Sequence, residues 1–263
     1  TRARVSSQSW KRAMRQMFVD AYGEENLGVR TKNIASVIAK ELETLGFKQE
    51  DAIAASVDAM IRLGMIAAPS DNSNKKDDKE DKKKTSKKKQ DDSKEEKINM
   101  ETKALTFIGY DCAKRLAKII SESEIPDRKD DSDEGEKANR AYKRVLQKAM
   151  SGPYPVNIAL FGRMVADDPG LSCDAAAQVA HSISTHEVHV ESDYFTAVDD
   201  LKVDSSGAGH LGVAEFCSAT LYRYATVAVH ELARNCKDDV AIAAREFVKA
   251  FVLSMPTGKQ NTF

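Results

Sequence analysis

The chain has 263 residues, a length that suits one domain with a large insertion as well as two domains. Its 40 basic and 41 acidic residues nearly cancel, so any polyanionic partner must be recognised by a local cluster of charge. No apolar run approaches the roughly 20 residues of a membrane span, the amino end does not resemble a signal peptide, and the four cysteines show no close pairing; together these features predict a cytoplasmic protein with reduced thiols and no membrane partner.

The first eighteen residues predict the end of a strand, two serines and an amphipathic helix. One face of the helix is apolar and holds Trp10, Met14, Met17 and Phe18. A second stripe, spaced i, i+3, i+4 and i+7 and here called the basic stripe, holds Gln8, Lys11, Arg12 and Arg15. Ser6 and Ser7 precede the first turn, where side-chain oxygens cap free amides and the helix end favours an anion. No acidic residue lies between Thr1 and Phe18, which favours a phosphate-binding face over ordinary solvated helix surface.

The middle of the chain, residues 30–150, is predicted to be mostly helical. Apolar spacing indicates helices over 34–45, 52–63, 103–123 and 137–150, and Gly46 and Gly64 fit the ends of the first two. Residues 69–98 are nearly devoid of apolar side chains, and Lys75 to Lys97 holds 11 lysines against 8 acidic residues. Such a segment cannot bury enough surface to offset its ordering entropy, so a disordered loop is predicted. A nucleic-acid-binding tail is the alternative, which the interleaved aspartates disfavour.

The last part of the chain alternates between strand and helix patterns. A buried strand is predicted over residues 156–161, and a helix over 172–184 with Ser172 as its N-cap. An extended, hairpin-like segment follows, then a strand pair or one long strand over 217–232, and a closing helix over 238–255. Strands and helices that flank an all-helical insert predict an α+β domain with an inserted helical module.

Two short motifs resemble contact sites for a nucleic acid. Tyr194 and Phe195 are adjacent in a polar segment, and neighbouring strand residues point to opposite faces, so one ring can pack inward while the other stacks on a base. The alternative is that both rings pack against the domain. Arg163 and Met164 follow Gly162 at the end of the predicted strand, a pattern that has little meaning on its own.

A metal-dependent nuclease is the alternative to a protein that binds a nucleic acid without cutting it. The residues that favour it are His181, His186 and His189, with Asp193, Asp199 and Asp200 downstream. However, His181 lies in the predicted helix and the other two histidines in a turn-to-strand segment, so capping or surface roles explain them as well. No nucleophile elbow, phosphate-binding loop or dinucleotide fingerprint occurs, so we predict no catalytic residue, no metal and no cofactor.

Three blocks of sequence resemble one known family. They are "RVSSQSWKRAMR" at Arg4 to Arg15, "NIALFGRM" at Asn157 to Met164, and the segment from Ala176 to Ala225. Their order and spacing are similar to those of the CasC backbone subunits of type I-E CRISPR Cascade complexes, and "PTGKQ" near the carboxyl end resembles a further family segment. The chain opens without Met on "TRARV", so we expect an internal fragment of such a subunit that lacks both termini.

The resemblance implies a hand-shaped fold. Its palm would be a ferredoxin-like, RNA-recognition-motif-like sheet formed by residues 1–29 and 151–263. Its fingers would be the helical insertion of residues 30–150, and its thumb a β-hairpin at about 188–219. The strands lack an aromatic-rich RNA-recognition signature, so base stacking on the sheet is not expected.

The resemblance also implies a non-catalytic subunit that binds CRISPR RNA. Copies would assemble head to tail along the guide, beside other Cascade subunits, and leave its bases open to target DNA. RNA contacts carry over to the palm residues Ser6, Gln8, Lys11 and Arg15, with Arg12 beside them on the stripe. Arg163 and Met164 would border the kinked nucleotide, and Tyr194, Phe195 and Thr196 would form the wedge of the thumb.

Overall fold

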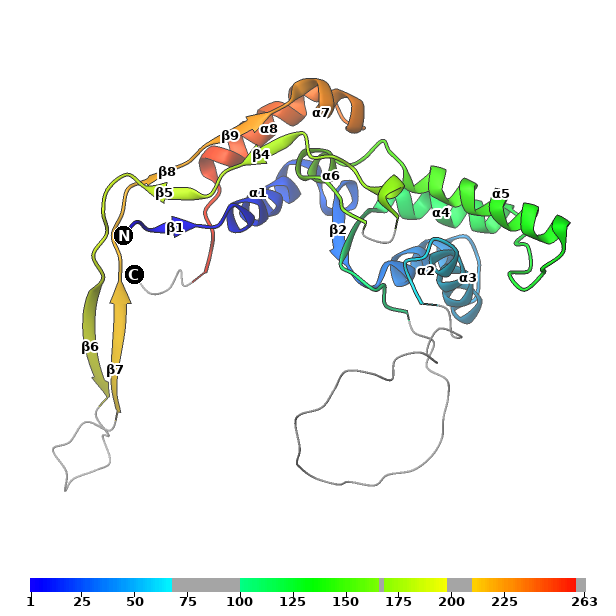
Figure 1. Ribbon diagram of the computed structural model, residues 1–263, viewed down its shortest axis with the longest axis horizontal. Helices are drawn as coiled ribbons and strands as arrows, with labels where there is room; N and C mark the ends of the chain where they lie inside the picture. The colour runs from blue at the N-terminus through cyan, green and yellow to red at the C-terminus, as the bar shows by residue number, and fades with distance from the viewer. Residues whose placement is uncertain (68–99, 166–167, 198–209, 259–263) are drawn as a thin grey trace.

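The computed structural model describes residues 1–67, 100–165, 168–197 and 210–258. The molecule is elongated: the helices α2 to α5 form one end, the ribbon of β6 and β7 forms the other, and the remaining elements lie between them (Figure 1). The predicted Lys/Asp-rich loop lies outside the described residues. Within the described ranges, no helix is both long enough and apolar enough to cross a membrane.

The central part combines short strands with helices. Its elements are β1 (Arg4–Val5), α1 (Ser7–Tyr22), α6 (Val156–Phe161), β4 (Ala177–Val179), β5 (Ser182–Ser184), β8 (Leu221–Tyr222), β9 (Ala225–Val227), α7 (Val229–Asn235) and α8 (Val240–Leu253). The predicted opening and closing helices are confirmed as α1 and α8. Mixed helices and small antiparallel sheets agree with the predicted α+β class.

The strands of the central part form one interrupted antiparallel arrangement. The strand β5 pairs with both β1 and β8, while β4 pairs with β9. Val179 lies opposite Ala225, but Ile183 lies opposite Tyr222, so three residues on one strand face two on the other. This difference of one residue falls where the β4–β9 pair ends and the sheet of β1, β5 and β8 begins.

The helix predicted over residues 172–184 is wrong, because this segment forms β4 and β5. The buried side chains of β5 are Ser182 and Ser184, whereas Ile183 is 43% exposed. The serines are tolerated inside because both are hydrogen-bonded: Trp10 Nε1 donates to Ser182 Oγ at 2.8 Å, and the amide of Ala3 donates to Ser184 Oγ at 3.1 Å. A polar inner face conceals the alternation by which a strand is recognised.

The strand predicted over residues 156–161 is also wrong, because these residues form the helix α6. All side chains from Val156 to Leu160 are buried, so the element has no polar face from which a period could be read. Gly162, with φ of 81°, ends the helix. A buried core surrounds α6 and includes Met14, Phe18 and Phe247 from the helices α1 and α8.

The end of the molecule opposite the β6–β7 ribbon is built from helices and a second two-stranded ribbon. Its elements are β2 (Gly28–Thr31), α2 (Ile34–Thr44), α3 (Gln49–Arg62), β3 (Thr106–Gly109), α4 (Tyr110–Glu122) and α5 (Asp133–Met150). Its helices share a second buried core, which includes Ile38, Met60 and Leu116. Gly46 and Gly64 have φ of 96° and 78° and follow α2 and α3, as predicted. The prediction that this region is all helical is wrong for residues 106–109, because they form a strand, β3, that pairs with β2.

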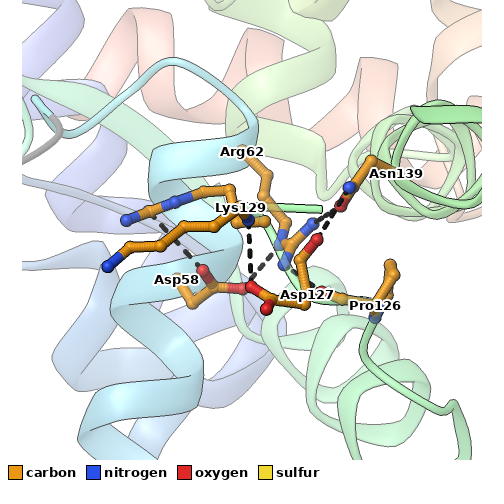
Figure 2. Close-up of polar contacts among 7 residues, drawn as sticks. Asp58, Arg62, Pro126, Asp127, Lys129 and Asn139 are labelled. Atoms are coloured by element: carbon orange, nitrogen blue, oxygen red, sulfur yellow. Dashed lines mark hydrogen bonds and ion pairs between the residues drawn. The ribbon is translucent and has the colours of Figure 1, made fainter. Parts of the chain in front are cut away.

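An arginine fixes the acidic connection between α4 and α5. Arg62 donates to Asp58 at 2.5 Å, to Asn139 Oδ1 at 2.5 Å and to the carbonyl of Pro126 at 2.7 Å (Figure 2). Asn139 in turn donates to the carbonyl of Asp127 at 2.9 Å. The connection is therefore tied to both α3 and α5.

The predicted hairpin-like segment contains β6 (Glu191–Ala197) and β7 (His210–Phe216). They pair antiparallel along their full length, from Glu191 opposite Phe216 to Ala197 opposite His210. The β6–β7 ribbon projects away from the strands β1, β5 and β8 (Figure 1). Every side chain of β6 is exposed.

Candidate nucleic-acid interface

The amino end of α1 is capped by groups of the protein itself. Ser6 Oγ accepts from the amide of Gln8 at 3.3 Å, and His181 Nδ1 accepts from the amide of Ser7 at 3.0 Å. The amide of Ser9 donates to the carbonyl of Ser6 at 3.0 Å. The expectation of open amides that attract an anion is therefore corrected, because these donors already have partners. Ser6 is confirmed as the helix cap.

The basic stripe lies on the polar side of α1, as the helical wheel predicts. Trp10, Met14 and Phe18 are buried on the opposite side. Gln8 and Arg12 are exposed, whereas Lys11 and Arg15 are half-buried. The stripe therefore has access to solvent while its two central cations are partly held by the fold.

Aromatic rings lie beneath the two half-buried cations. Lys11 Nζ lies 5.9 Å from the centre of the Phe161 ring, and the guanidinium of Arg15 lies 4.9 Å from that of Phe107. Burial and the charge of Arg15 lower the pKa of Lys11. Burial lowers the pKa of Arg15, and the charges of Arg30 and Arg12 lower it further. Burial is the larger cause of both shifts and the nearby like charges the smaller one. An anion placed among these cations would relieve their repulsion.

Two residues of this surface were missed by the sequence analysis. Arg30 and Phe107 face each other across the β2–β3 ribbon, and the guanidinium of Arg30 lies 5.8 Å from the ring of Phe107. Both residues line two adjoining hollows of about 230 and 560 Å³. The first hollow also contains Arg12 and Arg15, and the second contains Gln8 and Met164. The sequence could have indicated Arg30 only as an arginine outside any predicted helix face. Its pairing with Phe107 could not be predicted, because the two residues are distant in sequence and meet only in the folded chain.

The two hollows share Arg30 and Phe107 and lie beside α1; together they are here called the palm groove. It is defined by Gln8, Lys11, Arg12, Arg15, Arg30, Phe107, Phe161 and Met164. Glu24 and Asp174 also line the hollows, yet within the described ranges none of the four cations of the palm groove forms an ion pair. Its positive charge is therefore available to an external anion.

A buried amide holds the ribbon against the central part. Asn157 is 4% exposed; it accepts from the amide of Gly28 at 2.9 Å and donates to the carbonyl of Gly28 at 2.7 Å. A Cβ on Gly28 would lie 2.5 Å from the side chain of Ile158, so only glycine permits this close approach. Arg30 is thus positioned by a rigid contact two residues away.

Arg163 and Met164 have opposite surroundings. Arg163 is 3% exposed, and its guanidinium donates to the carbonyls of Leu171 and Met150, each at 3.0 Å. It also stacks on the ring of Tyr154, at 4.9 Å. The guanidinium of Arg163 is therefore enclosed by the protein, although the residue lines the same hollow as Met164; that both border the kinked nucleotide stays a prediction. Met164 is 81% exposed at the edge of the palm groove.

The aromatic residues of the hairpin lie apart from the palm groove (Figure 1). Phe195 lies opposite Gly212, and a Cβ on Gly212 would approach its ring to 2.3 Å, so Phe195 covers its cross-strand partner. Tyr194 lies opposite Val213 and is 69% exposed. Thr196 follows on the same strand, so the three predicted wedge residues are consecutive and accessible.

Two of the three histidines of the nuclease alternative, His181 and His186, take part in local hydrogen bonds. His186 contacts the carbonyl of Glu187 at 2.7 Å through Nδ1 and accepts from the amide of Thr220 at 3.3 Å through Nε2. His181 caps α1 as described. In the ranges that the structure describes, no group of three His, Cys, Asp or Glu residues could hold a metal. Asp199 and Asp200 lie outside the described residues.

Two solved structures are similar to this chain along almost its whole length. The first is titled "CRISPR RNA-guided surveillance complex, pre-nicking" and matches with a TM-score of 0.68 and 31% identity over 99% of this chain and 65% of that chain. The second, "CRISPR RNA-guided surveillance complex", matches with a TM-score of 0.56 and 24% identity over 97% of this chain and 63% of that chain. This chain thus spans just under two-thirds of the length of either relative.

The fold is therefore that of chains found in CRISPR surveillance complexes. The sequence pattern of the CT1975-like proteins, a family of Cas proteins, matches residues 1–263, and the chain belongs to this family. No curated protein sequence matches the chain.

Proposed function

We propose that the chain is a non-catalytic, CRISPR RNA-binding backbone subunit of a Cascade-type complex. The observation that carries the proposal is the palm groove, in which Lys11, Arg15 and Arg30 are held on aromatic rings. These three cations and Arg12 lack ion-pair partners in the described part of the chain. Relatives in RNA-guided surveillance complexes support the same ligand class.

Within this class, the type I-E CasC subunit is the proposed identity. The central part would be the ferredoxin-like palm of residues 1–29 and 151–263, and residues 30–150 the fingers. The β6–β7 ribbon would belong to the thumb at about 188–219. Copies would line up head to tail on the guide, each thumb reaching the RNA held by its neighbour, beside other Cascade subunits and target DNA.

The palm groove would hold the sugar–phosphate backbone without reading sequence. Lys11, Arg12 and Arg15 supply point charges and guanidinium donors for phosphate oxygens, and Gln8 supplies a neutral donor. Such contacts position a strand but carry no sequence information. That property suits a guide carrier, in which base pairing provides specificity.

Met164 and the hairpin would distort the bound strand. Met164 offers an exposed apolar side chain beside the cations, where it can displace a base from its stack. Tyr194, Phe195 and Thr196 would act in the same way on the strand bound by the neighbouring copy. Unstacking a base costs a few kcal/mol, which contacts with two subunits can offset.

The test is a double substitution, Lys11→Ala with Arg15→Ala. We expect weaker binding to single-stranded RNAs of unrelated sequence, with a salt dependence whose slope falls by roughly 0.7 for each lost phosphate contact. Fluorescence anisotropy titrations across a salt series measure both quantities. Arg245→Ala is the control, since it removes a positive charge from an exposed position on α8, outside the palm groove. Equal affinity and slope in all three proteins would reject the proposal.

A further inference from the structure

We propose that Arg15 and Arg30, both held on the ring of Phe107, form a site for one phosphodiester group of a single-stranded RNA. The site lies where α1 meets the β2–β3 ribbon, and would carry the RNA path from the palm onto the base of the helical end. The identity of the ligand depends on the proposed function; the site itself depends on the geometry below.

One ring organises two guanidinium groups from different parts of the chain. The Arg15 guanidinium lies 4.9 Å and the Arg30 guanidinium 5.8 Å from the centre of the Phe107 ring. Arginine stacked on an aromatic ring keeps its N–H donors free at the edge of its plane. Because Phe107 is half-buried, it also restricts the rotamers of both side chains.

The electrostatic environment favours an anion between the two groups. The two guanidinium groups share the ring of Phe107, so their like charges lie close together. Burial lowers the pKa of Arg15, and the charge of Arg30 lowers it further. Neither arginine has an ion pair or hydrogen-bond acceptor among the residues that the structure describes, although Glu24 lines the same hollow. A phosphate accepts hydrogen bonds from two guanidinium groups at once and removes their repulsion.

The surrounding fold makes the site rigid. The bidentate contact of Asn157 with Gly28 fixes one end of β2, and Arg30 pairs directly with Phe107 in the ribbon. Arg15 projects from the middle of α1, whose opposite side is buried in the core of the central part. The site is therefore ready to bind before the ligand arrives, which lowers the entropic cost of binding.

Arg30→Ala tests the site in the full chain, with Arg245→Ala as the matched control. We expect Arg30→Ala to weaken binding of a fluorescein-labelled single-stranded RNA about tenfold and to lower the salt slope by roughly 0.7, since one charged phosphate contact is lost. Phe107→Leu keeps both charges but removes their common support, so it should weaken binding less and leave the salt slope unchanged.

A second measurement separates this site from the proposed function. Inorganic phosphate should raise the melting temperature of the unmodified chain and of Arg245→Ala, and should raise that of Arg30→Ala less. If RNA binding depends on Lys11 and Arg15 but Arg30→Ala behaves like the control in both assays, the site is rejected and the proposed function stands. If no RNA binds, the proposed function fails. In that case the site stands on the phosphate result if Arg30→Ala loses the stabilisation, and is rejected if it does not.

Discussion

The palm groove and the hairpin use aromatic residues in opposite ways. In the palm groove, Phe107 and Phe161 lie beneath cations. In the hairpin, Tyr194 and Phe195 are 69% and 51% exposed. The described strands of the hairpin contain no lysine or arginine, and they carry three acidic side chains, Glu191, Asp193 and Glu215. The palm groove therefore has charge to hold a phosphate backbone, whereas the described strands of the hairpin offer a base aromatic and polar side chains but no lysine or arginine.

This contrast separates the two regions by their response to salt. Binding that depends on phosphate contacts weakens as counterions compete, with a slope proportional to the number of contacts. Stacking on an aromatic ring exchanges no counterion, so its contribution is nearly independent of salt. Substitutions in the two regions should therefore change different parameters of the same titration.

The largest expected effect is on stability and concerns Arg163, which is buried behind the palm groove. Arg163→Ala removes the donors for two buried carbonyls and leaves a cavity beside Tyr154, which should lower the free energy of unfolding by about 3 kcal/mol. Urea denaturation followed by circular dichroism measures this loss. The neighbouring substitution Met164→Ala should change stability by less than about 0.5 kcal/mol, because the side chain is exposed.

Substitutions at Arg163 and Met164 distinguish a residue that supports the palm groove from one that contacts RNA. Met164→Ala should weaken RNA binding in a protein of normal stability. Arg163→Met, which keeps the volume but not the donors, should bind RNA normally at temperatures where it remains folded. If Arg163→Met instead lowers the salt slope of RNA binding, the buried guanidinium must reach the ligand, and the positioning role is wrong.

Elements whose pattern is local and whose one face meets water could be predicted from the sequence. The helix α1 is such a case, because its wheel separates a buried face from the basic stripe without reference to other elements. The same holds for α8 and for the helices that Gly46 and Gly64 end. For these elements, local spacing and tertiary packing point to the same structure.

Elements in which polar side chains are buried, or in which distant segments meet, could not be predicted from the sequence. The buried residues Ser182 and Asn157 are paired with the indole of Trp10 and the backbone of Gly28, and neither partner can be identified from spacing. Arg30 and Phe107 come together only through strand pairing. The basic half of the palm groove on α1 was therefore predictable, and the half on the ribbon was not.

The next prediction concerns the hairpin. Tyr194→Ala should weaken RNA binding by about tenfold under conditions where copies of the chain assemble on RNA, since stacking on one base is worth about 1 to 3 kcal/mol. The salt slope should stay unchanged, in contrast to the substitutions in the palm groove. Tyr194→Phe keeps the ring and serves as the control. Stability should not change, because the side chain is exposed.

A lower slope after Tyr194→Ala would contradict the contrast between the two regions. It would mean that the hairpin organises phosphate contacts instead of stacking. Normal binding would mean that Tyr194 faces away from the RNA. Phe195 would then be the next candidate, although its ring covers Gly212.

The smallest expected effect is at the start of α1. Ser6→Ala removes the cap that accepts from the amide of Gln8, so the free energy of unfolding should fall by about 1 kcal/mol. RNA affinity should change far less than in Lys11→Ala with Arg15→Ala, because Ser6→Ala removes no charge from the basic stripe. Thermal denaturation and anisotropy titrations measure the two quantities.

Ser6→Asp tests whether RNA passes the amino end of α1, because it keeps the cap and adds a negative charge at the end of the basic stripe. Stability should return to that of the unmodified chain, since aspartate caps helices as well as serine does. RNA affinity should nevertheless fall, most strongly at low salt, if the strand passes this end of α1. Unchanged affinity at low salt would place the RNA path further along the helix, towards Arg15 and Arg30.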